Sequence, residues 1–214
     1  MTDKEFIKRI AELYVKARQT TFPADNIRRG KSHSISSQVE DLFAFYISTM
    51  VSDDTKIYVD QPISFELNGK SKTIYADVAV IKGNKIEQVW DLKTDLGWIR
   101  DSFVQFCKDK TLLVKGARNQ TAKLKDGLKR VQQSLTFSGD MTFNIVVVSL
   151  TNISITKGDL NVEGTRNLEN VGVYFLTKAL HPNNYEMTPD DIAEKVSYNE
   201  TDLKLMATRI KTNK

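Results

Sequence analysis

The sequence carries an aspartate two residues before a lysine in three places, a spacing that suits chemistry on phosphate esters. The three copies are Asp54-Thr55-Lys56, Asp91-Leu92-Lys93 and Asp202-Leu203-Lys204. Carboxylate oxygens are the ligands that Mg²⁺ prefers, and a nearby ammonium group can offset charge that develops on a reacting phosphate. Because the tripeptide is short, the surrounding sequence has to decide which copy performs such chemistry.

Two of the copies have surroundings that argue against a site. The first lies in a polar connection with no apolar run before it. The third is preceded by Pro189-Asp190, which completes a literal Pro-Asp…Asp-x-Lys match. However, Thr188-Pro189-Asp190-Asp191 has the pattern of a helix start, with a threonine cap, a proline in the first turn and acidic residues facing the helix dipole. We therefore interpret both copies as incidental.

The middle copy ends a predicted strand. Asp91 and Lys93 close the apolar run 86–93, and strand alternation places both side chains on one face. The preceding apolar run, 73–81, contains Asp77. An aspartate inside a buried strand is costly unless it is paired or binds a metal. Asp77, Asp91 and Lys93 are therefore predicted to form a catalytic cluster, and the alternative is chance charge at a sheet edge.

The turn between these two strands decides whether the aspartates can meet. Opposed residues of an antiparallel hairpin share a face, and the loop length sets which residues are opposed. A three- or five-residue loop around Gly83-Asn84 would place Asp77 and Asp91 on the same face. A two- or four-residue loop would place them on opposite faces unless a β-bulge intervened.

The elements expected around this cluster predict an α/β fold. Apolar residues at helical spacing predict helices over 3–19 and from about 36 to 50. Three strands joined by hairpin turns are predicted over 56–67, 72–81 and 85–93, followed by a long helical region over 99–135 that is broken near Gly116. Buried strands over 143–150 and 171–176 and a polar helical segment complete the chain. This order predicts a mixed sheet with helices on both faces.

This order of elements, with Asp77 and Asp91-Leu92-Lys93 at the strand ends, resembles the core of the PD-(D/E)XK, or restriction-endonuclease-like, nucleases. The resemblance covers roughly residues 36–176, and Ala76 stands where the family often has proline. It implies a central mixed five-stranded sheet flanked by helices. On this basis the chain is expected to be a single nuclease domain, with an N-terminal helix and basic loop over 1–35, the nuclease core over 36–176 and a helical appendage over 177–214.

The resemblance also implies roles for the cluster. Asp77, Asp91 and the main-chain carbonyl of Leu92 would hold Mg²⁺, which would polarise the scissile phosphate and lower the pKa of a water. Lys93 would orient that water and offset charge in the transition state. Such enzymes generally leave a 5′-phosphate and a 3′-hydroxyl.

Glu40 has two readings that the sequence leaves open. Many members of the family carry an acidic residue on the first core helix that supports the metal or its water, and Glu40 matches that residue. The stretch Ser37-Gln38-Val39-Glu40 is also a capping box, in which Glu40 would return to the amide of the cap.

Basic residues indicate where double-stranded DNA could bind. Eight basic residues stand against two acidic ones between Lys108 and Arg130. The alternative is a solvated helix face. The residues predicted to contact DNA come from this run and from the loop after the first helix, and they are Lys123, Lys125, Lys129, Arg130, Arg28, Arg29 and Lys31.

Composition is that of a soluble globular protein, with 40% hydrophobic and 27% charged residues in a chain of 214. The lone Cys107 excludes an internal disulfide or a zinc site built on cysteines. The start of the chain has no apolar signal core, and no apolar run approaches the ~18 residues of a membrane span. We expect a cytoplasmic protein that makes no membrane contact. His33 and His181 lie far apart in the sequence and are interpreted as isolated surface residues.

Three functions follow, in order of preference. The first is a type II restriction endonuclease dependent on Mg²⁺, which would be a homodimer if its DNA site is palindromic. The second is a nuclease of the same fold that acts in repair, recombination or branched-DNA processing. The third is a nucleic-acid-binding protein that kept the fold without the chemistry, and the intact Asp77, Asp91 and Lys93 argue against it.

Overall fold

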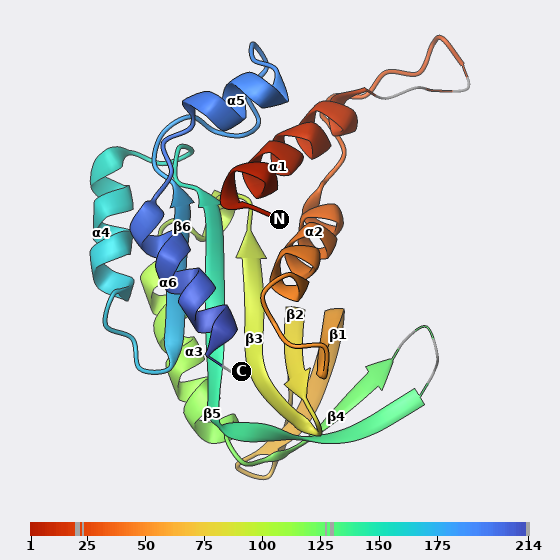
Figure 1. The fold of residues 1–214 in the computed structure, drawn as a ribbon, viewed down its shortest axis with the longest axis vertical. Coiled ribbons are helices and arrows are strands. Elements are labelled where there is room, and N and C mark those ends of the chain that lie inside the picture. Colours follow the sequence, from red (N-terminus) through yellow and green to blue (C-terminus); the bar gives the residue numbers. More distant parts are fainter. Residues whose placement is uncertain (20–21, 23, 127, 129–130, 213–214) are drawn as a thin grey trace.

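Figure 1 shows a computed structural model of the chain, which describes all residues except 20–21, 23, 127, 129–130 and 213–214. In the described residues, six α-helices and one short 3-10 helix, η1 (Gly97–Ile99), accompany a six-stranded mixed sheet. The helices are α1 (Asp3–Arg18), α2 (Ser36–Ser48), α3 (Phe103–Ala117), α4 (Ile155–Thr165), α5 (Pro189–Lys195) and α6 (Glu200–Lys211). The strands are β1 (Thr55–Leu67), β2 (Lys70–Lys82), β3 (Lys85–Lys93), β4 (Thr121–Asp126), β5 (Val131–Ser149) and β6 (Val171–Thr177). The predicted α/β class and mixed sheet are confirmed.

The six strands pair in the order β3-β2-β1-β4-β5-β6, with a further pairing between β3 and β5. β1, β2 and β3 form an antiparallel meander, whereas β5 runs parallel to β3 and to β6. β4 is antiparallel both to β1 and to the first part of β5. Five strands therefore close into a ring at the end of the sheet that lies lowest in Figure 1, while β6 extends the open half.

The sheet separates two hydrophobic layers. One layer packs against α3, and the other packs against α1, α2 and α6. Neighbouring residues of β3 enter opposite layers: Val89 lies in the α3 layer and Trp90 in the other, and both are fully buried. Because strand residues alternate, Asp91 then faces the α3 side of the sheet. Helices on both faces agree with the expectation from the sequence.

The predicted long helical region over 99–135 is wrong beyond Ala117. Ala122 and Leu124 of β4 are buried, whereas the residues on either side of each are exposed, which is the period of a strand and not of a helix. The lysines at the exposed positions made this short alternation look like a polar helix face. β5 likewise begins at Val131 and not at 143. The sheet therefore has six strands in place of the five expected.

The helix starts follow local sequence signals. The Thr2 side chain caps α1 by accepting a hydrogen bond from the Glu5 N–H. A capping box between Thr188 and Asp191 opens α5, with Pro189 in its first turn, which confirms the interpretation of that stretch as a helix start. In the ranges that the structure describes, none of these helices has the length and apolar character needed to cross a bilayer.

Candidate active site

A β-bulge in the β2–β3 hairpin places the two aspartates on a common face. The turn Gly83-Asn84 has two residues and would by itself put Asp77 and Asp91 on opposite faces. The register shifts by one residue between positions 86 and 88 of β3. Beyond this shift Val78 is opposed to Trp90, so the two aspartates occupy the next opposed positions. The structure thus meets the geometric condition through a bulge and not through an odd-numbered loop.

Each aspartate has a partner on β3. The Leu92 N–H donates a hydrogen bond to Asp77 Oδ2 at 2.6 Å, and Lys93 Nζ forms an ion pair with Asp91 Oδ1. The Asp91 side chain is 11% exposed and that of Lys93 30% exposed. The carboxylate is therefore enclosed by the protein, whereas the lysine side chain is partly exposed to solvent.

Burial and mutual repulsion raise the pKa of two carboxyl groups in this cluster. For Asp77, burial and then the negative charge of Asp91 raise the pKa to about 6, against the opposing effects of the Leu92 N–H and Lys93. For Glu40, burial and then the charge of Asp77 raise the pKa to about 7, and Lys93 again opposes the rise. The cations around these carboxylates do not offset their burial and repulsion, so the cluster favours an additional cation.

The structure excludes the capping-box reading of Glu40. α2 begins at Ser36, and its N-cap is Ile35, which makes no side-chain capping hydrogen bond. Ser37 therefore lies inside the helix and does not act as the cap of a capping box. Glu40 instead interacts electrostatically with Asp77 and Lys93, which places it at the cluster.

Lys110 of α3 is a second cation at the cluster that the sequence analysis missed. Its Nζ lies 4.6 Å from the ring centroid of Phe106 and 4.8 Å from that of Phe143. Burial lowers the pKa of Lys110, and the neighbouring Asp91 opposes that shift. Lys110 stands three residues after the buried Cys107, on the inward face of α3, and this helical spacing is the signal that could have identified it.

Asp60 of β1 is a further carboxylate near the cluster. Its φ of 48° interrupts the pairing of β1 with β2 at the position opposite Asp77. The negative charge of Asp60 contributes to the raised pKa of both Asp77 and Glu40. Asp60 directly follows the apolar run Ile57-Tyr58-Val59, and this position was the available sequence signal.

These residues suit a hard divalent cation with few protein ligands. In the described part of the chain no three or more His, Cys, Asp or Glu side chains are arranged as a metal-ligand group. Mg²⁺ usually binds one or two carboxylates and keeps several waters. Asp77, Asp91 and the Leu92 carbonyl are the groups that could provide such a donor set, and the repulsion between Asp77 and Asp91 is what an added cation would relieve.

The residues predicted to contact DNA lie in two separate places. Arg28, Arg29 and Lys31 are exposed in the segment before α2, and the described part of this segment extends away from the body of the molecule in Figure 1. Lys123 and Lys125 are exposed on β4, where their spacing of two puts both on the same face of the strand. Lys129 and Arg130 lie outside the described residues.

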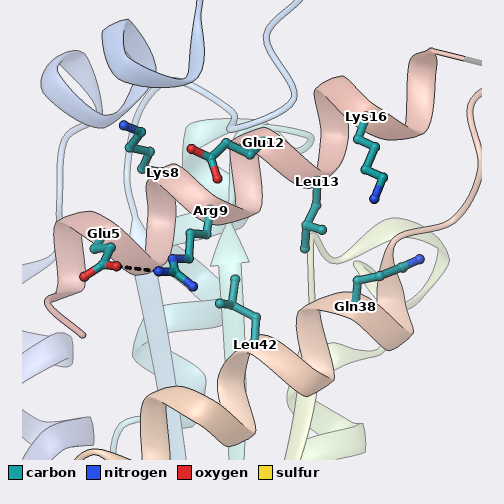
Figure 2. Close-up of a pocket in the computed structure, with 8 residues that line it drawn as sticks. All are labelled: Glu5, Lys8, Arg9, Glu12, Leu13, Lys16, Gln38 and Leu42. Carbon is teal, nitrogen blue, oxygen red and sulfur yellow. Dashed lines mark hydrogen bonds and ion pairs between the residues drawn. The ribbon is translucent and has the colours of Figure 1, made fainter.

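The groove between α1 and α2 is separate from the cluster. It has a volume of about 580 Å³ and is lined by α1 residues with Gln38 and Leu42 of α2 (Figure 2). Figure 2 shows Arg9 directed at Glu5, and their side chains lie 2.8 Å apart. At helical spacing, Glu40 points to the opposite side of α2 from Gln38 and Leu42. This groove therefore does not contribute to the site.

The raised pKa values predict that stability depends on pH and on metal. Asp77 and Glu40 bind protons more tightly in the folded than in the unfolded chain, so stability should fall as pH rises from about 5 to 8. Mg²⁺ should raise the melting temperature at pH 8 and much less at pH 5, where these carboxyls are protonated. Calorimetry across this range, with and without Mg²⁺, measures both effects.

The double variant Asp77→Asn with Glu40→Gln is the control for this measurement. It should melt at nearly the same temperature at pH 5 and pH 8 and should lose the response to Mg²⁺. A wild-type melting temperature that stays constant over this range would contradict the charge cluster described above.

Comparisons with known proteins do not identify a relative. The chain matches no protein-family description, no curated protein and no solved structure. The assignment of the site therefore rests on the register of the β2–β3 hairpin and on the charges gathered at its end.

Proposed function

We propose that this chain is a Mg²⁺-dependent nuclease that hydrolyses phosphodiester bonds in double-stranded DNA. The observation that carries the proposal is the cluster of Asp77, Asp91 and Glu40 around Lys93, with two of the carboxyl pKa values raised. Such a cluster is costly in a folded protein unless a function retains it. A divalent cation would offset the negative carboxylates, and a phosphate group would offset the positive Lys93. These two ligands together therefore complement the charges of the cluster.

Each residue of the cluster has a distinct task in this proposal. Asp77 and Asp91, with the Leu92 carbonyl, would hold Mg²⁺, and Glu40 would support it from α2. When bound, Mg²⁺ supplies positive charge to the phosphate oxygens and makes a water more acidic. Lys93 places its ammonium group at the solvent-facing side of Asp91, where it can orient the attacking water and offset charge on the phosphate. The products would carry a 5′-phosphate and a 3′-hydroxyl.

The order of elements supports a PD-(D/E)XK-type core. α2, the β1–β3 meander, α3, β5 and β6 follow one another as the resemblance implies, and β4 with the first part of β5 is an insertion between α3 and the remainder of that core. In these nucleases the chemistry lies at the ends of the second and third strands of the meander. Here Asp91 lies near the end of β3, and Asp77 lies within β2 at the next position opposed to it.

We further propose a type II restriction endonuclease in the cytoplasm, dimeric if its recognition site is palindromic. Incubation of supercoiled plasmid with the protein and Mg²⁺ tests this directly. Discrete linear fragments that share one end sequence are expected. Degradation to a smear would favour a repair or recombination nuclease, and intact plasmid with tight binding would leave a non-catalytic DNA-binding protein.

A further inference from the structure

The two histidines of the chain, far apart in sequence, line one pocket beside the end of β3. The chain contains only two histidines, His33 in the loop before α2 and His181 after β6. Both line a pocket of about 350 Å³ whose wall also includes Thr94 and Asp95. Thr94 directly follows Lys93, so the pocket begins one residue from the candidate active site. Its volume lies in the range of small-molecule sites, roughly 300–1,000 Å³.

His181 is held in a defined orientation. Its Nδ1 accepts a hydrogen bond from the Asn183 N–H at 2.9 Å, which leaves the proton of the neutral ring on Nε2. Nε2 lies 3.9 Å from Asp95 Oδ2, and the ring of Tyr14 packs edge-on at 5.7 Å between centroids. Interaction with His181, and the N–H of Gly97, lower the pKa of Asp95. The ring is therefore positioned by its surroundings and is not a freely rotating surface group.

The remaining wall of the pocket carries groups that can donate hydrogen bonds to an anion. Ser34 and Ser36 supply hydroxyl groups that lie 3.1 Å apart, and Thr94 and the Tyr14 phenol supply two more. Asn183 contributes an amide whose oxygen accepts a hydrogen bond from Arg18 Nη1 at 3.0 Å. Hydroxyls and imidazoles in this arrangement can donate to phosphate oxygens.

The charge around the pocket also favours an anion. Asp95 is its acidic group, and it is already engaged by His181 and acted on by Arg100. Arg18 is bound next to Asn183, and Tyr14 is kept neutral because burial raises its pKa. Asp95, whose negative charge is already engaged, is thus the one acidic residue in the described lining of the pocket.

We propose that this pocket binds the phosphate group of the nucleotide next to the bond that is cut, an assignment that rests on the proposed nuclease function. A DNA strand whose scissile phosphate lies at Lys93 would place a neighbouring phosphate against Thr94, His33 and His181. The same strand would continue toward the exposed Arg28, Arg29 and Lys31, because these precede His33 on one loop.

Proton NMR of the full chain in metal-free buffer tests the pocket without any cleavage. Because the chain has only two histidines, its imidazole C2 protons give two resonances. At pH 6, titration with thymidine 5′-monophosphate and with the dinucleotide thymidylyl-thymidine should shift both resonances saturably, whereas thymidine should shift neither. If either resonance does not shift with the phosphate probes, or if thymidine shifts the resonances equally, the proposal is overturned. A response to the monophosphate alone would contradict binding of an internal nucleotide.

Matched variants separate binding from a structural role. His33→Gln and His181→Gln should each weaken thymidine 5′-monophosphate binding about 10-fold, the loss typical for a hydrogen bond to a charged group. With DNA as substrate, each should raise KM and leave kcat unchanged. Lys204→Gln, on an exposed face of α6, is the control and should bind as wild type. A lower kcat with unchanged KM in the histidine variants would refute the assignment.

The outcomes for the pocket and for the nuclease are distinguishable. Histidine shifts in a protein that leaves plasmid intact would keep the phosphate pocket and refute the proposed nuclease. Cleavage by a protein whose histidine resonances do not respond to either phosphate probe would refute the pocket alone.

Discussion

Asp91→Ala and Lys93→Met are each expected to reduce Mg²⁺-dependent DNA cleavage by a factor on the order of 10²–10³ or more. Asp91→Ala removes the carboxylate that we propose to hold the cation. Lys93→Met removes the positive charge that we propose to face the phosphate. Methionine keeps much of the lysine stem, so the loss reports on the charge and not on packing. Initial rates on plasmid, with folding checked by thermal melting, measure the effect.

The two variants should differ in metal binding. Asp91→Ala should no longer bind Ca²⁺ at the site, whereas Lys93→Met should bind it at least as well as wild type, because the ion pair between Lys93 and Asp91 no longer competes with the metal. DNA binding in Ca²⁺ should persist in the lysine variant. The matched control is Asp54→Ala, which alters another Asp-x-Lys copy, at the start of β1, and should cut normally. Folded Asp91 or Lys93 variants with wild-type rates would remove these residues from the mechanism.

Trp90→Ala is expected to destabilise the fold by about 3–5 kcal/mol, the cost of truncating a fully buried tryptophan. Trp90 packs edge-on against Phe43 at 5.3 Å between centroids and lies 5.9 Å from Tyr174, so it joins α2 and β6 across β3. Its Nε1 donates to Gln88 Oε1 at 3.0 Å in the buried layer. At roughly 2–4 °C per kcal/mol for a chain of this size, calorimetry should show a large drop in melting temperature.

Trp90→Phe separates the packing of Trp90 from its hydrogen bond, and Leu112→Ala is a control at an exposed position. Trp90→Phe keeps an aromatic ring but leaves the Gln88 oxygen without its donor, so an intermediate loss of about 1–3 kcal/mol is expected. Leu112→Ala removes a leucine that is 71% exposed and should change stability by less than about 0.5 kcal/mol. Equal melting temperatures for wild type and Trp90→Ala would show that Trp90 does not hold this layer together.

The β2–β3 hairpin shows which structural features local sequence patterns predict and which they do not. The alternation of apolar residues predicted β2 and β3 closely, and the same alternation selected Asp91 and Lys93 as neighbours on one face. The two-residue turn alone would put Asp77 on the opposite face from Asp91, and the bulge at position 87 that prevents this depends on how β3 packs against β2 and β5 together. A bulge is not marked by particular residue types. The sequence could therefore predict only the condition under which Asp77 and Asp91 share a face.

The helix prediction for the β4–β5 region was wrong for a related reason. Its lysines give the same polar appearance to an exposed strand face as to a helix face, and only six residues alternate in β4. β4 is held by pairing with β1 and β5, which are distant in the chain, so its conformation is a consequence of ring closure and not of its own propensity. The prediction relied on local composition, whereas pairing with distant strands determined the conformation of this segment.

The sequence by itself determined the α/β class, the positions of most strands and the helix start at Thr188. These depend on spacing within about ten residues, where side-chain periodicity and capping act directly. Only the tertiary structure brought Glu40 and Lys110 to the aspartates and His33 to His181. Those contacts join elements from opposite layers or distant loops, and the energy that holds them comes from burial of the whole sheet, which no short segment encodes.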